Sequence, residues 1–370
     1  MFQKKKIMVV FGTRPEAIKM APLIYELRRN NKLEISVCLT AQHREMVDQV
    51  LTDFNIKPDY DLNIMQQNQT LVDLSVRLLT NLDELFKNVR PDLLLVHGDT
   101  TTTFIASLAA YYNKIPIGHV EAGLRTWNKF SPYPEELNRQ FTGIMADLHF
   151  APTEQAALNL RRENKLKSSI FITGNTVIDA VKMTVKENYH HTVLNLLEKK
   201  KLILLTIHRR ENLEKIEEIF NAIRTIADKF KDIVFLYPVH LNPVIRKTAD
   251  QLLNNHEQII LVDPLSTYDF HNLMARSYLI LTDSGGIQEE APSLGIPVVV
   301  LRESTERPEG VEAGTLVLAG TDFETICHTV NDLLTSPNSY KKMANAVNPY
   351  GDGNASKKIV NAILEYFKID

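Results

Sequence analysis

The 370-residue chain is predicted to form two α/β domains, each built on a doubly wound and mainly parallel β-sheet. Short apolar, β-branched runs alternate with stretches of helical character along the whole chain, a pattern typical of βαβ units. The runs divide evenly between the two halves, and the length exceeds that of one typical core. A chain with these properties is expected to fold as two domains of similar size.

The predicted strands are short apolar runs that end at polar residues. In the first half they cover residues 7–11, 34–40, 92–99, 115–123, 147–153 and 170–175. In the second half they cover residues 201–208, 233–240, 259–264, 279–284, 297–302 and 315–320. We expect the first domain to span residues 1–172 and the second 173–355, with the amphipathic helix of residues 356–370 packing back near the first.

The composition indicates an ordinary soluble globular protein. The chain is 44% hydrophobic and 24% charged, and its net charge of -3 argues against a nucleic-acid surface. We find neither a signal peptide nor a segment long enough to span a membrane. Cys38 and Cys327 lie in apolar surroundings, so we interpret them as buried hydrophobic residues in a reducing compartment. These features predict a cytoplasmic protein.

Residues 281–310, LTDSGGIQEEAPSLGIPVVVLRESTERPEG, contain a candidate anion site. We expect a strand ending in Asp283, a turn at Ser284, Gly285 and Gly286, and a helix that opens with the acids Glu289 and Glu290. Backbone N–H groups at such a turn bind phosphate, although an ordinary tight turn has the same sequence features. Parallel sheets bind ligands at their carboxyl ends, so we expect one site in a cleft between the domains.

Candidate carboxylates cluster in the first half of the chain. Asp99 and Glu121 follow predicted strands, and Glu135 shares a predicted helix face with Arg139. Carboxylates brought to one site shift each other's pKa, which suits acid and base chemistry. Simpler alternatives are that Asp99 caps the following helix and that Glu135 forms an i,i+4 ion pair with Arg139.

Candidate cations occur in both halves of the chain. Arg14 and Lys19 are placed to face an anion at the start of the first helix, or they are solvated surface charges. His208, Arg209 and Arg210 follow a strand in the second half and suit a diphosphate, with a salt-bridged loop as the alternative. We find no GxGxxG fingerprint and no zinc-ligand spacing.

Together these motifs closely resemble the bacterial non-hydrolysing UDP-N-acetylglucosamine 2-epimerases, relatives of the GT-B glycosyltransferases. The resemblance covers essentially the whole chain. Its motifs, in order, are FGTRPEAIKMAPL, AQHREM, HGDTTTT, HVEAGLRT, SPYPEELNR, FITGNTVID, HRREN, YPVHLNP, LTDSGGIQEEAPSLG, TERPEG and NPYGDG. It implies two Rossmann-like domains of the GT-B type and no NAD or metal cofactor.

The activity implied by the resemblance is the interconversion of UDP-GlcNAc and UDP-ManNAc. The C2 proton is not acidic, so epimerisation needs either oxidation or departure of the C1 substituent. The family mechanism eliminates UDP to give a bound 2-acetamidoglucal and then adds UDP back. The product would supply a cell-envelope polysaccharide. A retaining GT-B glycosyltransferase, a hydrolysing epimerase and a non-catalytic sugar-nucleotide sensor remain as alternatives.

The resemblance also implies residue roles and partners. The catalytic set is Asp99, Glu121, Glu135, Arg139 and His208, without a decision on which carboxylate is acid and which is base. The substrate-binding set is Arg14, Lys19, Phe270 near uracil, Ser284, Gly285, Gly286, and Glu290 at the ribose. An allosteric UDP-GlcNAc is expected at Gln42, His43, Arg209 and His240. We expect a homodimer.

Overall fold

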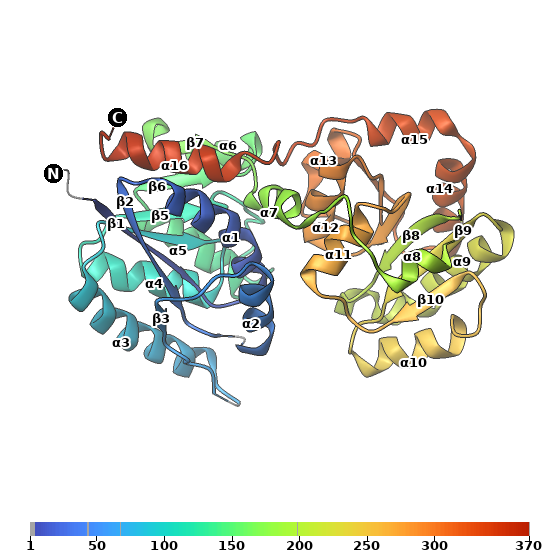
Figure 1. The fold of residues 1–370 in the computed structure, drawn as a ribbon, viewed down its shortest axis with the longest axis horizontal. Coiled ribbons are helices and arrows are strands. Elements are labelled where there is room, and N and C mark those ends of the chain that lie inside the picture. Colours follow the sequence, from blue (N-terminus) through green and yellow to red (C-terminus); the bar gives the residue numbers. More distant parts are fainter. Residues whose placement is uncertain (1–3, 43, 67, 198, 370) are drawn as a thin grey trace. The chain divides into compact units, whose positions relative to one another are not determined.

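A computed structural model describes residues 4–42, 44–66, 68–197 and 199–369 and divides into two compact units. Unit 1 comprises Met1–Met183 and Tyr350–Asp370, and unit 2 comprises Thr184–Pro349. Each unit is a parallel sheet with helices on both faces (Figure 1). The predicted α/β fold class of two doubly wound sheets is confirmed. The division falls later than the expected boundary after residue 172, because the helix that follows residue 175 packs in unit 1.

Seven parallel strands form the sheet of unit 1, in the order β3-β2-β1-β4-β5-β6-β7. They are β1 (Lys5–Phe11), β2 (Leu33–Leu39), β3 (Tyr60–Asp61), β4 (Leu93–His97), β5 (Ile117–Val120), β6 (Leu148–Ala151) and β7 (Ile170–Ile172). The prediction of six strands missed β3, which has two residues and no apolar run. Its position beside β2, with Tyr60 opposite Cys38, defines it as a strand.

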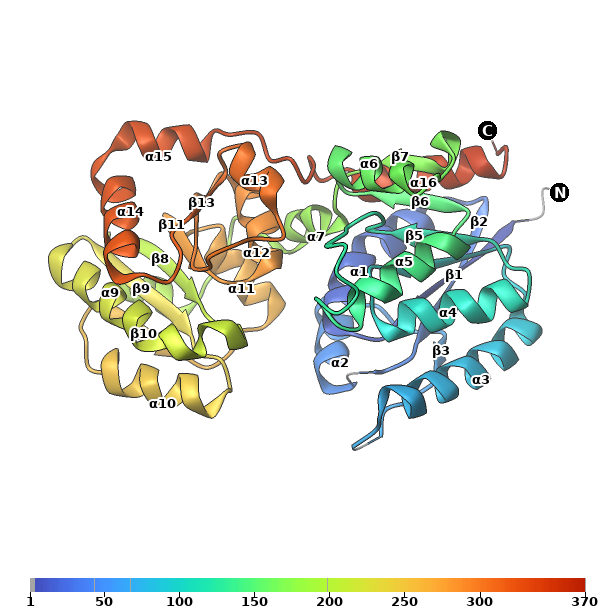
Figure 2. The ribbon, with the colours of Figure 1, turned by 180° about the vertical axis from the view of Figure 1, so that it is seen from behind.

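Residue alternation along β1 divides the core of unit 1 between the two faces of its sheet. Ile7 and Val9 belong to one apolar cluster, whereas Met8 and Val10 belong to another. Figure 2 shows the helices over the second face. The helices of unit 1 are α1 (Arg14–Arg29), α2 (Arg44–Asp53), α3 (Leu71–Val89), α4 (Thr101–Tyr112), α5 (Glu135–Met145), α6 (Glu154–Arg162), η1 (Lys167–Ser169), α7 (Thr176–Thr184) and α16 (Ala355–Tyr366).

Six parallel strands form the sheet of unit 2, in the order β10-β9-β8-β11-β12-β13. They are β8 (Lys201–Thr206), β9 (Ile233–Pro238), β10 (Ile259–Val262), β11 (Leu279–Thr282), β12 (Val298–Val300) and β13 (Leu316–Leu318). The helices are α8 (Thr192–Leu196), η2 (Arg210–Lys215), α9 (Ile216–Lys229), α10 (Pro243–Leu252), α11 (Thr267–Met274), α12 (Gly285–Glu290), η3 (Ala291–Leu294), α13 (Pro308–Glu312), α14 (Phe323–Thr335) and α15 (Pro337–Ala344). In both sheets the strand order reverses beside the first strand, where doubly wound folds bind ligands.

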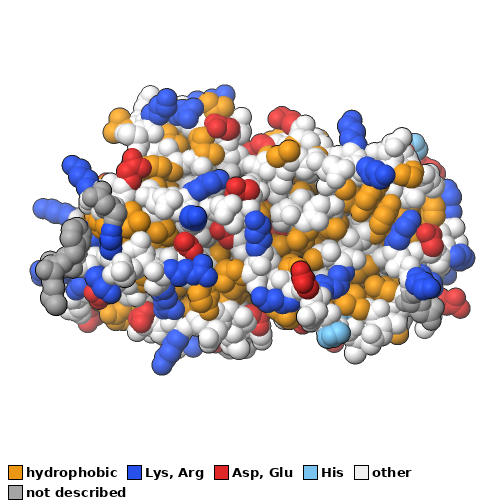
Figure 3. Space-filling view, turned by 45° about the horizontal axis from the view of Figure 1, so that its top comes forward, with side chains coloured by type: hydrophobic (Ala, Val, Ile, Leu, Met, Phe, Trp, Pro, Cys, Tyr) orange, Lys and Arg blue, Asp and Glu red, His pale blue; other side chains and the backbone are white. Residues whose placement is uncertain are grey.

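The surface agrees with the small net charge. Acidic and basic side chains are interspersed over the face drawn in Figure 3. Within the described ranges no helix has the length and apolar character needed to cross a bilayer. Cys38 is fully buried, but Cys327 is only half-buried, so the predicted burial of Cys327 was wrong. Cys327 lies on α14 at the margin of the unit 2 core.

The C-terminal helix α16 packs on α1 in unit 1 (Figure 1). Ile359 and Ile363 are completely buried in the same cluster as Ile7 and Val9. The N-terminus of α16 is capped from another helix, because Asp179 of α7 accepts hydrogen bonds from the backbone N–H of Ala355 at 3.1 Å and of Ser356 at 2.8 Å. Asp179 therefore ties the returning chain to unit 1.

The variant Asp179→Ala is expected to lower the free energy of unfolding by about 2 kcal/mol, since two amides at a helix N-terminus lose a charged acceptor. Urea denaturation followed by circular dichroism measures this change. Asp250→Ala, on the exposed side of α10, is a suitable control and should change stability by less than about 0.5 kcal/mol. Equal effects of the two variants would contradict the assigned capping role.

Candidate active site

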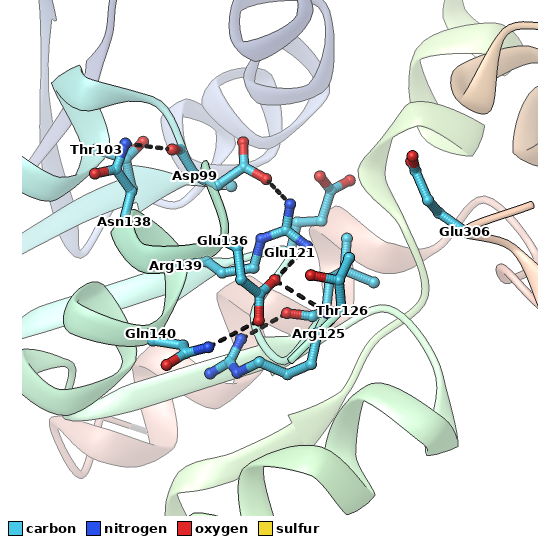
Figure 4. Close-up of polar contacts among 12 residues, drawn as sticks. Asp99, Thr103, Glu121, Arg125, Thr126, Glu136, Asn138, Arg139, Gln140 and Glu306 are labelled. Carbon is cyan, nitrogen blue, oxygen red and sulfur yellow. Dashed lines mark hydrogen bonds and ion pairs between the residues drawn. The ribbon is translucent and has the colours of Figure 1, made fainter. Parts of the chain in front are cut away.

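In unit 1, Asp99 and Arg139 form the first part of the candidate site (Figure 4). Asp99 follows β4, and its Oδ2 accepts a hydrogen bond from Arg139 Nη2 of α5 at 2.6 Å. Arg139 Nη1 also lies 3.5 Å from Oε2 of Glu136, which is completely buried. Thr100, not Asp99, caps α4 and accepts from the Thr103 N–H at 3.1 Å. The capping alternative for Asp99 was therefore wrong.

The i,i+4 alternative for Glu135 was also wrong. Among the described residues, no ion pair joins Glu135 to Arg139; the guanidinium turns instead to Asp99 and Glu136. Glu135 is the first residue of α5 and is half-buried. It is close enough to Asp99 for its charge to affect the pKa of that carboxyl.

Glu121 follows β5 and is held by groups from three other elements. Its Oε2 accepts from Lys19 Nζ of α1 and from Asn175 Nδ2, the latter at 2.6 Å. His97 Nε2, at the end of β4, lies 3.8 Å from the same oxygen. Only 8% of the Glu121 side chain is exposed, so the ion pair with Lys19 compensates for its burial. Lys19 thus faces a carboxylate within the protein.

The Asp99 carboxyl has an environment suited to carrying a proton. Burial raises its pKa; the Arg139 guanidinium opposes this effect, and the charges of Glu121 and Glu135 add to it. Part of the side chain is still accessible, with 27% of its surface exposed. A carboxyl with a raised pKa beside an ionised carboxylate is a common arrangement for acid and base pairs.

Three buried histidines lie on adjacent strands of this sheet: His97 ends β4, His119 is the third residue of β5, and His149 is the second residue of β6. His119 Nε2 lies 2.7 Å from the carbonyl oxygen of Gly98, so this nitrogen carries the ring hydrogen. The bond steadies the turn that presents Asp99. Burial lowers the pKa of His97 to about 4, of His119 to about 3 and of His149 to about 4. All three rings are neutral at pH 7.

These histidines predict acid sensitivity. The pKa of His149 falls from 6.5 to about 4 on folding, so the unfolded chain binds the proton first as the pH falls below 6.5. Stability present above pH 6.5 is lost towards pH 4, by up to about 1.4 kcal/mol per pH unit for each ring. His149→Phe should reduce the slope of unfolding free energy against pH by about that amount. The exposed His190→Asn is the control, and an unchanged slope in His149→Phe would refute the assignment.

A rigid turn supports Glu121 from the C-terminal side. Gly123 has a φ of +92°, and a Cβ there would lie 2.2 Å from the carbonyl oxygen of Ala156. Two residues on, Arg125 has a fully buried side chain that donates to both carboxylate oxygens of Glu163, at 2.6 and 2.8 Å. The HVEAGLRT motif therefore combines one candidate catalytic group with a fixed scaffold.

Glu16, which is not among the predicted site residues, joins two of these loops. Its carboxylate accepts from the Thr13 N–H at 2.8 Å and from the Thr100 and Thr103 hydroxyls at 2.8 and 3.1 Å. It thereby connects the turn bearing Arg14, which is half-buried at the start of α1, to the turn bearing Asp99. Thr13 and Glu16 form a capping box, and that spacing is readable in the sequence.

In unit 2, Asp283 organises the loop that carries His208. Its buried carboxylate accepts from the backbone N–H of His208 at 3.0 Å and of Arg209 at 2.9 Å, and from Asn212 Nδ2 at 3.0 Å. His208 Nδ1 lies 3.2 Å from Asp283 Oδ1. Partial burial lowers the pKa of His208, although Asp283 opposes this effect. Asp283 was predicted only as the end of a strand, yet it orients a candidate catalytic ring.

Ser284 is the N-cap of α12, and Gly285 and Gly286, predicted as part of a turn, are the first two residues of the helix. The expectation that Glu289 and Glu290 open this helix was wrong, because α12 begins at Gly285 and the two acids are its last residues. Their backbone N–H groups are therefore not at the free end of the helix. The first turn of α12 contains no acid that would repel an anion.

Two arginines flank the start of α12. A Cβ on Gly285 would lie 3.6 Å from Arg209 Nη2 and 3.9 Å from Arg307 Nη2. Arg307, from the TERPEG motif, forms an ion pair with Glu289 and was not singled out as a site residue. Glycine and guanidinium groups together suit a bound phosphate. Absence of a side chain at Gly285 keeps the approach to both cations clear.

The remaining predicted substrate contacts also lie in unit 2. Glu290 Oε2 lies 3.5 Å from His271 Nε2, and its Oε1 lies 3.1 Å from the position of a Cβ on Gly286. Phe270 precedes His271 in α11 and is half-buried. This unit therefore brings Glu290 and Gly286 close to the middle of α11.

The predicted allosteric residues belong to both units. In unit 1, Gln42 Oε1 accepts a hydrogen bond from the Thr102 hydroxyl at 3.0 Å. In unit 2, the His240 ring is edge-on to that of His208 at 6.1 Å, and Arg209 Nη1 lies 3.7 Å from Glu306 Oε1. His43 lies outside the described residues.

Known proteins with similar sequences and structures cover nearly the whole chain. A UDP-N-acetylglucosamine 2-epimerase from Bacillus subtilis is 60% identical over 366 residues, covering 99% of this chain and 96% of that protein. The structure of the Neisseria meningitidis UDP-GlcNAc 2-epimerase bound to UDP-GlcNAc matches with a TM-score of 0.88 and 50% identity, over 97% of this chain and 100% of that one.

A more distant likeness concerns the fold alone. Acinetobacter baumannii MurG, a GT-B protein, matches with a TM-score of 0.63 and 12% identity over 98% of this chain and 99% of that one. The family model described as UDP-N-acetylglucosamine 2-epimerase matches residues 25–364. The chain therefore belongs to the UDP-N-acetylglucosamine 2-epimerase family.

Proposed function

We propose that the protein interconverts UDP-GlcNAc and UDP-ManNAc by inverting C2 of the sugar. The observation that carries the proposal is the carboxylate pair of unit 1: Asp99 and Glu121 follow adjacent strands, each with a cation attached. The family relationship and the UDP-GlcNAc bound by the Neisseria relative support the same substrate. The UDP-ManNAc formed would supply a cell-envelope polysaccharide.

The proposed reaction is an elimination followed by an addition. A carboxylate removes the C2 proton, the C2–H electron pair becomes the C1=C2 double bond, and the C1–O bond breaks so that UDP leaves with its electron pair. The bound 2-acetamidoglucal then takes a proton at the other face of C2, and a UDP oxygen re-forms the bond to C1. No net oxidation or reduction occurs.

We assign the proton transfers to unit 1. Glu121 is held by two donors, which favour the carboxylate, whereas burial raises the pKa of Asp99 and favours the acid. Because the reaction is reversible, the group that donates in one direction accepts in the other. Glu135 is the third candidate carboxyl, and Arg139 would stabilise charge beside Asp99.

We assign the diphosphate and nucleoside mainly to unit 2. Ser284, Gly285, Gly286 and the His208 imidazole would contact the diphosphate. In unit 1, Arg14 and Lys19 remain the proposed substrate-binding residues. Glu290 would accept from a ribose hydroxyl, and Phe270 would contact uracil. Interactions of this kind stabilise a leaving group as charge develops on it.

A second UDP-GlcNAc is proposed as an activator, bound by Gln42, His43, Arg209 and His240. Arg209 supports this proposal because its guanidinium lies beside Gly285, so that a ligand held by Arg209 would be linked to the proposed diphosphate contacts at the start of α12. Activation would appear as a lag when the reaction starts from UDP-ManNAc alone. Linear initial progress without a lag would exclude this role.

We also propose that the protein is a homodimer. Exposed apolar side chains on α4 and α5, among them Tyr112, Phe141 and Ile144, support the proposal. Phe141 stacks on Phe104 with ring centroids 5.5 Å apart, which joins the two helices into one apolar face. Sedimentation of the wild type and of Ile144→Glu would test this: the variant should shift to monomer, and an unchanged sedimentation coefficient would exclude this face.

The main test is incubation with UDP-GlcNAc in D2O without added NAD, followed by NMR. We expect deuterium at C2 of both UDP-sugars. A UDP-sugar product without C2 exchange would contradict elimination. Release of free ManNAc and UDP would indicate a hydrolysing enzyme. Transfer of the sugar to an added acceptor would indicate a glycosyltransferase, and binding without turnover would indicate a sensor.

A further inference from the structure

We propose that Asn175 is a positioning residue that orients the carboxylate of Glu121. Asn175 also links the chain segment that leaves unit 1 to the segment that returns to it. The inference rests on the proposed function, in which Glu121 transfers a proton. Asn175 lies in the FITGNTVID segment, just before α7, and only 3% of it is exposed.

Glu121 needs external support because its backbone conformation is unusual. Its φ is 61°, in the left-handed region that non-glycine residues seldom adopt. Lys19 alone is a poor orienting group, because its ammonium is a point charge on a flexible stem. The amide of Asn175, 2.6 Å from Oε2, lies on a short side chain with only two rotatable bonds. A buried asparagine therefore directs the carboxylate more sharply than the lysine does.

Asn175 is itself held at each of its polar groups. Its backbone N–H donates to the Tyr350 carbonyl at 2.7 Å, and its Oδ1 accepts from the Val177 N–H at 3.1 Å, as a helix N-cap does. With Oδ1 so occupied, Nδ2 must be the atom that faces Glu121. The reverse orientation would place a carbonyl oxygen against a carboxylate.

Two glycines permit the contact with Tyr350. Gly174 and Gly351 have φ of +84° and +118°, and a Cβ on Gly174 would lie 3.1 Å from both the Cα of Gly351 and the Tyr350 carbonyl oxygen. A side chain at either position would force the segments apart. The chain passes into unit 2 after Met183 and returns at Tyr350. Asn175 thus binds the returning segment with its backbone and the candidate catalytic group with its side chain.

Several titratable groups surround Glu121 together with Asn175. Lys19 faces it from α1, His97 from β4, and Asp99 from the turn after β4. A donor at Oε2 stabilises the ionised carboxylate, so its loss makes Glu121 easier to protonate. In a variant without this donor, the acidic limb of the plot of kcat/KM against pH should therefore move to higher pH. A purely structural contribution from Asn175 would not move that limb.

Two variants distinguish the hydrogen bond that Asn175 Nδ2 donates to Glu121 from the bonds that Asn175 makes with Val177 and Tyr350. Asn175→Asp retains the side-chain volume, the acceptor for Val177 and the backbone bond to Tyr350, but presents an oxygen to Glu121. Asn175→Ala removes the donor without adding a charge. Both should lower kcat about tenfold to a hundredfold, the range for losing a charge-assisted hydrogen bond, with a smaller change in KM.

The matched control is Asn113→Ala at the end of α4. Asn113 Nδ2 also donates to a carboxylate, that of Asp83, at 2.8 Å, and it lies outside the proposed site. Its kcat and pH profile should match those of the wild type. If Asn175→Asp behaves like the wild type, or if Asn175→Ala lowers only thermal stability and leaves the acidic limb in place, the proposal is overturned.

A second readout does not depend on turnover. In protein labelled with 13C at glutamate side chains, the Glu121 carboxyl signal, assigned with Glu121→Gln, should titrate at higher pH in Asn175→Ala than in the wild type. An unchanged titration would refute the positioning role. If the wild type failed to exchange deuterium at C2, the proposed function would fail, and this titration would still decide the role of Asn175.

Discussion

Glu121→Gln is expected to lower kcat about a thousandfold, since removing a general acid or base costs about 10²–10⁴-fold. The amide has nearly the volume of the carboxyl and retains an oxygen for Lys19 and Asn175, but it cannot take up a proton. Epimerisation and C2 deuterium exchange should fall together, because both require removal of the same proton. NMR of the products in D2O measures both rates.

Binding and stability provide the controls for this variant. The affinity for UDP should change little, because the proposed UDP contacts lie mainly in unit 2. Glu84→Gln, the same chemical change on the exposed side of α3, should leave kcat unaltered. Full activity in Glu121→Gln would remove this residue from the catalytic set and transfer its role to Asp99 or Glu135.

Asp283→Asn is expected to have the second-largest effect, through the loop that bears His208. The substitution places an NH2 group against the backbone donors of His208 and Arg209 and against Asn212 Nδ2. At least one buried donor then loses its partner, at a cost of about 3 kcal/mol in unfolding free energy. Displacement of His208 and Arg209 should also weaken UDP binding about a hundredfold, a consequence of the proposed diphosphate contacts.

Urea denaturation and calorimetric titration with UDP measure these two effects. Asp322→Asn is the matched control in unit 2, because Asp322 caps α14 and asparagine caps helices about as well as aspartate. It should alter stability by less than about 0.5 kcal/mol. If Asp283→Asn bound UDP like the wild type, the His208 loop would not depend on Asp283, and His208 would need another orienting group.

Local patterns in the chain predicted much of this structure. The strands of both sheets follow from apolar runs, and the start of α5 at Glu135 follows from the proline before it. The helix boundary at α12 was misjudged, because two adjacent acids resemble a first turn wherever they stand. The strand β3 was missed because two residues carry too little periodicity to be recognised.

The candidate site was only partly predictable, because the partners of its residues are far apart in the sequence. Strand ends indicated Asp99, Glu121 and His208, since polar residues after apolar runs are visible in the chain. Their partners were not visible: Lys19 and Glu121 are 102 residues apart, and Asp283 and His208 are 75 apart. The sequence allowed Asp99 to be either a carboxyl of the candidate site or the N-cap of α4. In the structure its carboxylate contacts Arg139, and Thr100 caps α4.

The sequence by itself determined the α/β class, the strand positions, the polar strand ends and the resemblance to a family of sugar-nucleotide epimerases. These properties depend on residues close together in the chain or on motifs in a fixed order. Only the tertiary structure decided which charges pair, which carboxyl has its pKa raised, and how Asn175 and Asp283 hold their neighbours. Those outcomes depend on burial and on distances of a few ångströms between distant residues, because electrostatic and hydrogen-bond energies change steeply with both.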